Sequence, residues 1–396
     1  MTVVPVPAVR PDYIGRYRVI ERIGRGAMGA VYSASDEQLG RRVAVKLMLA
    51  AFEEDNELRE RFYREARVTG QLAHRNIVTV FDLGEHDGRP FIVMELLEGL
   101  PLNEYLRSEA APSLDTKLDL MIQVCDGLQN AHQAGVIHRD IKPSNMFVVN
   151  DGSLKVLDFG VARLSASNLT AAGMLLGTPE YMSPEQVRGQ KMDARADVFS
   201  AAGVFYFMLA GRPPFGSRDL RNVLHAIINE DPPPLSDDQV PESLRRVLAK
   251  GLAKNAEERC QSCAELRADL DHVRRALAVS TARVIQAARE RCRQILAVIE
   301  ERRALGRSLG IADIDATCDE AALRIQVRYP AFADPSAPPV TMDAAAAKAA
   351  LEALQTRYNT EQAALATLQQ RAIETITPER SRRQSFWRGL LRARGN

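Results

Sequence analysis

The stretch VIHRDIKPSNMFV, residues 136–148, places charged and amide side chains between two β-branched apolar runs. The apolar flanks predict short buried strands, and the polar insert predicts a loop held rigidly between them. Asp140 could orient an attacking hydroxyl, Lys142 could neutralise a migrating phosphoryl group, and Asn145 could bind a divalent cation. A rigid loop that carries these groups is a candidate active site.

A second acidic residue follows the loop in the segment LKVLDFGVA, residues 154–162. Asp158 comes after an apolar run and before Phe-Gly, where its carboxylate could bridge a metal ion to phosphates. In phosphoryl transfer the protein need not form a covalent bond to the substrate. It needs a phosphate cradle, cations and a positioned nucleophile.

A glycine-rich segment, IGRGAMGAVY, occupies residues 23–32 near the N-terminus. Gly24, Gly26 and Gly29 would let the backbone approach phosphate oxygens and donate N–H groups to them. The same pattern opens dinucleotide-binding units, but those require a helix directly after the glycines. Here an alternating, strand-like run follows, which favours a β-hairpin flap with Val31 against a flat ring beneath it.

A lysine suited to polyphosphate oxygens ends the run VAVK at Lys46. Its ammonium needs an anion to hold its position, and Glu65 on the following predicted helix is the obvious partner. Either residue alone could be a solvated surface charge. Their occurrence after a glycine flap favours a functional pair.

The composition describes a globular protein, with 46% hydrophobic and 26% charged residues among 396. This length predicts two domains or one large bilobal domain. The net charge of +1 gives no indication of a nucleic-acid partner. It conceals a basic C-terminal part, because residues 276–396 hold 18 Lys and Arg against 13 Asp and Glu.

The five cysteines are scattered and odd in number, which argues against a disulfide framework and for a reducing compartment. Cys260 and Cys263 form a lone C-x-x-C with no second pair and no nearby histidine. Two positions on a core helix are therefore favoured over a zinc site.

Strand-like runs separated by Gly and charged turns fill residues 17–98, with one helix predicted over 56–73. Helices predominate from about residue 101, which predicts an α+β arrangement with a cleft between two lobes. The most apolar stretch, residues 198–211, is shorter than the roughly 18–20 residues that cross a bilayer and predicts a core helix. The N-terminus lacks the order of a signal peptide, so a cytoplasmic protein is expected.

Apolar stripes at helical spacing predict two further long helices, over residues 280–305 and 345–376. A proline-rich connection lies between them, which indicates an antiparallel hairpin with residues 319–329 packed between or beside the two helices. Two interpretations remain open for this region. It could be a helical bundle that extends the preceding domain, or a coiled coil that forms a homodimer.

The ordered set of motifs resembles the eukaryotic-type, or Hanks-type, protein kinases. It comprises G-x-G-x-x-G-x-V, VAVK, HRDIKPSN, DFG and SPE, and it covers residues 17–275. The wordings RFYREA and GTPEYMSPEQ are similar to those of the bacterial serine/threonine kinases. This resemblance implies a bilobal kinase fold, an ATP-dependent serine/threonine phosphotransferase, Mg²⁺ as the metal, and protein substrates.

Carried over motif by motif, the resemblance makes Asp140 the catalytic base, with Lys142 beside it, and makes Asn145 and Asp158 the Mg²⁺ ligands. It implies that His138 and Phe159 stack in an internal hydrophobic column. The residues expected around ATP are Ile23, Gly24, Gly26, Gly29, Val31, Ala44, Lys46, Glu65, Met94, Glu95, Leu97 and Phe147.

The resemblance also implies regulation through the segment between DFG and SPE. Arg139 would hold a phosphorylated activation loop, because guanidinium pairs bidentately with phosphate. Thr170 is the leading autophosphorylation candidate, followed by Ser165 and Ser167, and Thr178 is expected near the substrate. Two sequence motifs differ from the usual family pattern. SPE replaces Ala-Pro-Glu, and KNAEER replaces the usual Asp-Pro but keeps the arginine, Arg259, that should pair with Glu185.

The expected organisation is an N-terminal extension (1–16), a kinase domain (17–275), a helical hairpin or coiled-coil region (276–378) and a basic amphipathic tail (379–396). The tail mixes six arginines with Phe386 and Trp387, so it could lie on an anionic membrane surface or remain solvated. Ser385 in RRQS is a possible self-substrate. No transmembrane segment is expected.

Two other classes of function were weighed. In a scaffold the C-terminal helices would act and the kinase fold would only bind nucleotide, but the filled positions Asp140, Asn145 and Asp158 argue against it. A nucleotide-binding oxidoreductase would need a helix after the glycines and an acidic residue closing a parallel sheet, and the sequence supplies neither.

Overall fold

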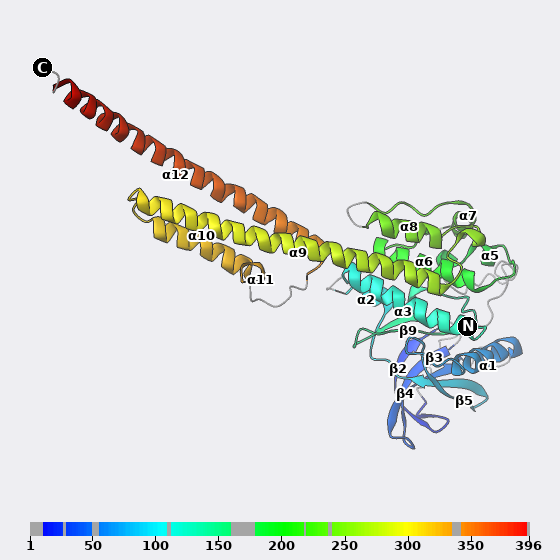
Figure 1. The fold of residues 1–396 in the computed structure, drawn as a ribbon. Helices are drawn as coiled ribbons and strands as arrows, with labels where there is room; N and C mark the ends of the chain where they lie inside the picture. Colours follow the sequence, from blue (N-terminus) through cyan, green and yellow to red (C-terminus); the bar gives the residue numbers. More distant parts are fainter. Residues whose placement is uncertain are drawn as a thin grey trace, which may run out of the picture. The chain divides into compact units, whose positions relative to one another are not determined.

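The computed structural model describes residues 11–26, 29–49, 55–108, 112–159, 179–217, 219–236, 240–334 and 342–393, with backbone alone for 57 and 375–393. The chain divides into two compact units, Met1–Arg274 and Arg275–Asn396 (Figure 1). The described helices include none that is both long enough and apolar enough to span a bilayer.

The first unit begins with a six-stranded antiparallel sheet in the order β1-β2-β3-β4-β6-β5. Its strands are β1 (Tyr13–Ile14), β2 (Tyr17–Arg25), β3 (Gly29–Asp36), β4 (Arg41–Met48), β5 (Val80–His86) and β6 (Arg89–Glu95). Helix α1 (Asn56–Gly70) interrupts them, starting at the side-chain cap of Asp55. The strand-rich region and the helix predicted over 56–73 are thus both present.

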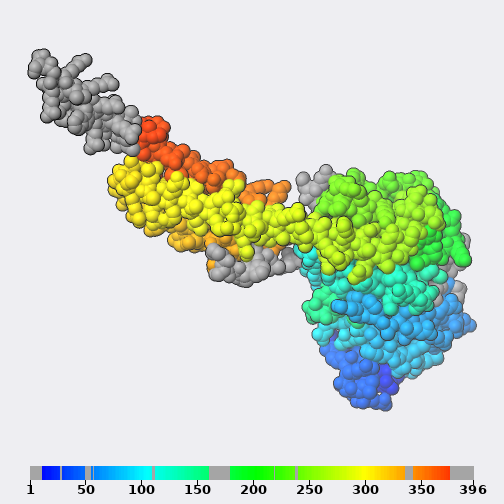
Figure 2. Space-filling model, in the orientation of Figure 1, coloured from blue at the N-terminus to red at the C-terminus, as the bar shows by residue number. Residues whose placement is uncertain are grey.

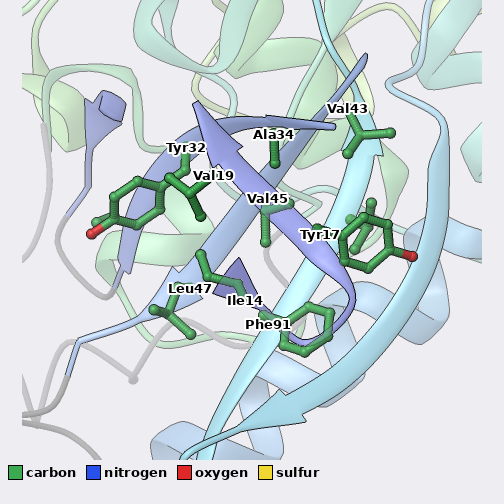
Figure 3. Close-up of a cluster of buried hydrophobic side chains, with 11 residues drawn as sticks. Ile14, Tyr17, Val19, Tyr32, Ala34, Val43, Val45, Leu47 and Phe91 are labelled. Carbon is green, nitrogen blue, oxygen red and sulfur yellow. The ribbon is translucent and has the colours of Figure 1, made fainter. Parts of the chain in front are cut away.

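Alternation along the strands gives the sheet two apolar faces. One face carries a cluster that includes Tyr17, Val45 and Phe91, all buried, as Figure 3 shows. The opposite face packs Met48 and Ile92 against Phe62 of α1, together with Ala66 of the same helix. Because Lys46 alternates with Val45 and Leu47 on β4, its side chain falls on the α1 face, where the site is built.

A mainly helical lobe follows. It contains α2 (Leu102–Tyr105), α3 (Leu114–Gln133), α5 (Pro184–Val187), α6 (Ala194–Ala210), α7 (Leu220–Asn229) and α8 (Glu242–Gly251). Single 3-10 turns lie at Pro143–Asn145, Pro179–Tyr181 and Ala256–Glu258. The core helix predicted over 198–211 is confirmed, because α6 is buried along nearly its whole length.

A small sheet in the order β7-β8-β9 lies at the C-terminal end of the segment 136–148. Its strands are β7 (Gly99–Pro101), β8 (Met146–Val149) and β9 (Leu154–Val156). The strand predicted after the polar loop is therefore present as β8, whereas no strand forms at the apolar run that precedes it. At Gly99, φ is +156° and an added Cβ would lie 2.0 Å from the Val148 carbonyl oxygen, so only glycine fits there.

The second unit is built from three helices and a short fourth. Helix α9 (Cys263–Ser308) starts in the first unit and continues unbroken, without the start predicted at residue 280, because no Gly or Pro interrupts its sequence before Gly306. It is followed by α10 (Ile314–Arg328), α11 (Pro330–Ala333) and α12 (Ala344–Ala393).

The direction of these helices differs from the prediction. Helix α10 runs back along α9, so α12 runs in the same direction as α9 rather than antiparallel to it (Figure 1). The described side chains of α12 lie along the α9 surface (Figure 2). Residues 319–329 do lie beside the long helices, because they belong to α10.

The three helices share one apolar core. Cys292, Ile295 and Ile299 of α9 pack with Ile325 of α10 and Leu354 of α12. Where α9 ends and α10 begins, the helices approach so closely that a Cβ on Gly306 would lie 2.3 Å from Ile314.

A charged group lies inside this helical unit. Glu361 of α12 accepts from Arg302 of α9 at 2.5 Å and from Arg357 at 2.6 Å, and its side chain is only 3% exposed. Both oxygens of this buried carboxylate are therefore paired with arginine.

Candidate active site

The loop that carries Asp140 is held by a carboxylate from α6. Asp197 is buried and accepts from the backbone N–H groups of His138 (2.8 Å) and Arg139 (2.9 Å). It also contacts His132 Nε2 at 2.7 Å. Arg139 adopts a left-handed backbone (φ +66°), which is uncommon outside glycine and which these bonds help to hold.

Three side chains that the sequence analysis predicted to act in the reaction meet in this loop. Lys142 Nζ donates to Asp140 Oδ2 at 2.7 Å, and Asn145 Nδ2 donates to the same oxygen at 3.1 Å. Asn145 Nδ2 also donates to the Asp140 carbonyl at 2.8 Å. Since both bonds use the amide nitrogen, the amide oxygen of Asn145 remains as an acceptor or a metal ligand.

The Asp158 carboxylate is tied to the sheet by Lys46. Lys46 Nζ lies 2.8 Å from Asp158 Oδ1 and 2.8 Å from Glu65 Oε1. Asp158 has a left-handed backbone, with φ +50°, and its side chain keeps 45% of its surface exposed. The backbone N–H of Leu157 donates to the Asn145 carbonyl at 2.8 Å, which links Asp158 to the catalytic loop.

Burial and the neighbouring charges shift the pKa values of Lys46, Glu65 and Asp158 in opposite directions. Burial raises the pKa of Glu65 to about 7, against the attraction of Lys46. Burial acts to lower the pKa of Lys46, but the charges of Asp158 and Glu65 outweigh it and raise that pKa. Burial acts to raise the pKa of Asp158, but Lys46 outweighs it and lowers that pKa.

The residues expected around ATP lie mainly on the adjoining strands β2, β3, β4 and β6. Gly24 is paired with Val31, and Ala44 with Met94. The backbone N–H of Gly26 donates to the Gly29 carbonyl at 2.8 Å and closes the end of the hairpin. The others are Ile23 at 48% exposure on β2, Glu95 at the end of β6, Leu97 just after it, and Phe147 on β8.

Some predicted residues lie outside the described part of the chain. These are Thr170 and Thr178, together with Ser165 and Ser167, in the segment of residues 160–178. The side chain of Ser385 is also outside it.

Two aromatic rings lie beneath the site. The rings of His138 and Phe159 have centroids 4.6 Å apart, and both side chains are buried. His138 Nε2 contacts the Leu157 carbonyl at 2.9 Å. The two rings are therefore in contact, as the resemblance implies, but their planes are tilted by 45°.

The expected pair between Arg259 and Glu185 is confirmed. The guanidinium of Arg259 donates to both carboxylate oxygens of Glu185, at 2.7 and 2.8 Å, and has no exposed side-chain surface. Burial acts to raise the pKa of Glu185, but Arg259 outweighs it and lowers that pKa.

The C-x-x-C cysteines are both buried and free. Cys260 lies near Glu265 and Asp269, a grouping that could in principle bind a metal. Lys250 already donates to both carboxylates, at 2.6 and 3.1 Å, so its ammonium supplies the positive charge.

The chemistry of the donors at the main site suits a hard divalent cation. Asp158 and Asn145 offer oxygens, and such cations take carboxylate and amide oxygen ligands. The ammonium of Lys46 adds positive charge beside these oxygens.

Sequence reasoning missed the residues that hold the catalytic loop. Asp197, His132 and Gln186 were not singled out, although Gln186 Nε2 donates to the Arg139 carbonyl at 2.8 Å. One signal was available. Asp197 is a lone acid at the start of a strongly apolar run, and a buried carboxylate must be paired.

Comparisons with known proteins agree with this geometry. The family described as "Protein kinase domain" matches residues 17–269. The PknI kinase domain of Mycobacterium tuberculosis, a crystal structure, is similar to the chain with a TM-score of 0.53 and 29% identity, covering 66% of this chain and 96% of that one.

Curated relatives carry kinase names. The chain is 40% identical to "Probable serine/threonine-protein kinase PknB" of Corynebacterium glutamicum, over 66% of this chain and 42% of the relative. It is 41% identical to "Serine/threonine-protein kinase Pkn1" of Myxococcus xanthus, over 66% and 39%. It is 40% identical to "Serine/threonine-protein kinase PknA" of M. tuberculosis, over 65% of this chain and 61% of that relative. The matched part spans about two fifths of the first two relatives.

Proposed function

The chain belongs to the protein kinase family, and on that premise we propose that it is an ATP-dependent serine/threonine protein kinase. One observation carries the proposal. The chain has a suitable side chain at each position that phosphoryl transfer requires, and these side chains are hydrogen-bonded or ion-paired to one another. Asp140 lies with Lys142 and Asn145 on one loop, and Asp158 is held by Lys46.

In the proposed reaction, Asp140 accepts a hydrogen bond from a serine or threonine hydroxyl of a protein substrate. The hydroxyl oxygen bonds to the γ-phosphorus as the bond from that phosphorus to the β,γ-bridging oxygen breaks, and ADP leaves. The hydroxyl proton passes to Asp140. Lys142, 2.7 Å from Asp140, lies close enough to stabilise the charge on the transferred group.

ATP would lie under the hairpin of β2 and β3. Gly24, Gly26 and Gly29 would cover its phosphates, and Lys46, oriented by Glu65, would contact the α- and β-phosphates. The backbone N–H of Glu95 already donates to the Thr79 carbonyl at 2.9 Å, so adenine would hydrogen-bond to other backbone groups of residues 95–97. The remaining proposed contacts are Ile23, Val31, Ala44, Met94, Leu97 and Phe147.

Mg²⁺ is the metal we propose, with Asn145 and Asp158 as its protein ligands. Bound there, the ion would neutralise charge on the phosphates. Other residues of the chain hold the two ligands in place. The side-chain amide of Asn145 donates a hydrogen bond to the Asp140 carbonyl, and Asp158 forms an ion pair with Lys46.

Regulation by self-phosphorylation is part of the proposal. Arg139 precedes Asp140 in the catalytic loop, and a phosphate on Thr170 would be its partner, with Thr178 near the substrate. For the second unit we propose homodimerisation through its long helices α9 and α12.

The test is incubation of the full chain with γ-labelled ATP and Mg²⁺, beside the Asp140→Asn variant, followed by mapping of labelled residues. Label on serine or threonine in the native chain only supports the kinase. Nucleotide binding without label in either protein would contradict it and would favour a scaffold.

A further inference from the structure

A cavity of about 500 Å³ lies in the first unit and shares no lining residue with the proposed catalytic site. Its walls come from the residues that follow α2, from the first turn of α3 and from the last turn of α6. Leu106, Pro112, Leu114 and Phe207 give it an apolar wall, and Arg107 and Lys117 give it two cations. Sites for small molecules have volumes of roughly 300–1,000 Å³ and combine an apolar lining with few polar groups.

Among the residues that the structure describes, the two cations have no anionic partner. Within the described ranges, neither the Arg107 nor the Lys117 side chain has an ion pair or a hydrogen bond. Lys117 is half-buried, and burial lowers the pKa of its ammonium. A partly buried ammonium gains from a bound anion, because an opposite charge offsets part of the lost hydration.

From these features we infer that the cavity binds an amphiphilic carboxylate, with an aliphatic chain against the apolar wall and the carboxylate at Arg107 and Lys117. A guanidinium matches a carboxylate bidentately, and an ammonium adds a second charge-assisted bond. The apolar wall supplies the affinity for the chain, and each methylene buried there strengthens binding about fourfold.

The competing interpretation gives the cations a structural role. Residues 207–211 end α6, and the C-terminus of a helix carries partial negative charge that attracts Lys and Arg. That interpretation predicts no saturable ligand binding. The binding experiment therefore separates the two.

The probe is decanoate, titrated below its micelle concentration into the full chain and followed by calorimetry. We expect saturable binding that is more than tenfold tighter than that of octanoate, because two methylenes are added. Decanol keeps the chain but lacks the charge, so it should compete at least tenfold more weakly than decanoate, and acetate lacks the chain and should not compete. Tighter binding of decyl phosphate than of decanoate would overturn the choice of carboxylate.

Two variants assign the binding to this cavity. Lys117→Gln and Arg107→Gln should each weaken decanoate binding about tenfold, and Arg107 is exposed, so its replacement leaves the fold intact. Lys348→Gln, which removes an exposed lysine of the second unit, is the matched control and should bind as the native chain does. Absence of saturable binding, or equal affinity in all three variants, would overturn the inference. The inference does not require kinase activity, so it can fail independently of the proposed function.

Discussion

The ammonium nitrogen of Lys46 and a carboxylate oxygen of Asp158 lie 2.8 Å apart, although 112 positions separate the two residues in the chain. Lys46 comes from the β-sheet, and Asp158 follows β9 beside the catalytic loop. The ion pair therefore joins the two lobes of the first unit at the position where phosphates would lie. Glu65 completes the arrangement from α1.

Replacement of Lys46 by Met should abolish most phosphoryl transfer. The variant loses the positive charge for the phosphates and leaves two carboxylates facing one another, so we expect a fall of about a hundredfold or more in kcat. The measurement is transfer of label to a protein substrate. Lys250→Met is the matched control, because Lys250 also bridges two carboxylates but lies outside the site. A similar loss in both variants would contradict a specific role for Lys46.

Activity should depend on pH through Glu65. Because the pKa of Glu65 is raised to about 7, its carboxylate becomes protonated as the pH falls below that value. Lys46 then loses one of its two anionic partners, and kcat/KM for ATP should fall between about pH 8 and pH 6. The γ-phosphate of ATP also titrates, so Glu65→Gln is measured in parallel. The additional step should be absent from that variant, and a step retained there would refute the assignment.

The pair of Arg259 and Glu185 should contribute strongly to stability. Arg259→Met leaves the largely buried carboxylate of Glu185 without its partner, which costs about 3 kcal/mol. The free energy of unfolding in urea provides the measurement. Arg246→Met is the control, because Arg246 is 75% exposed and its pair with Glu242 should be worth less than about 1 kcal/mol. Equal effects would show that burial of the pair is not decisive.

In the helical unit, Glu361→Ala should cost about 3–5 kcal/mol, because it leaves the buried Arg302 without its acceptor. Replacing Glu361 and Arg302 together by Leu should restore most of that loss, since an apolar pair can fill the same core. Helical circular dichroism during urea unfolding reports both values. Glu320→Ala, in an exposed pair with Arg324, should change stability by less than about 1 kcal/mol. A double variant no better than the single one would argue against this interpretation.

Motif spacing predicted side chains that lie close together in the structure, because the charges proposed to act on a phosphate must be of particular types in a particular order. The structure brings Asp140, Lys142 and Asn145 within hydrogen-bond distance, as one loop should. The groups that support the loop were not predicted. Asp197 and Gln186 bind backbone N–H and carbonyl groups of the loop, and such groups are the same whatever the loop sequence. Both residues also lie far along the chain from the loop.

The helical unit shows a different limit. An apolar stripe identifies which face of a helix is buried, but it carries no information about the direction of the neighbouring helix. The chain reverses between α9 and α10 within a few residues, where Gly310 and Asp313 adopt left-handed backbone conformations. Helix α10 thereby takes the antiparallel place beside α9 that had been predicted for α12.

The carboxylate of Asp197 has a consequence for the cooperativity of folding. The N–H groups of His138 and Arg139 belong to a loop, yet their acceptor is a buried side chain on α6. Their hydrogens should therefore exchange with solvent deuterium only when α6 itself opens, at the rate of the slowest core amides rather than of a surface turn. The segment that carries Asp140 would then be among the last parts of the first unit to become disordered as the protein unfolds.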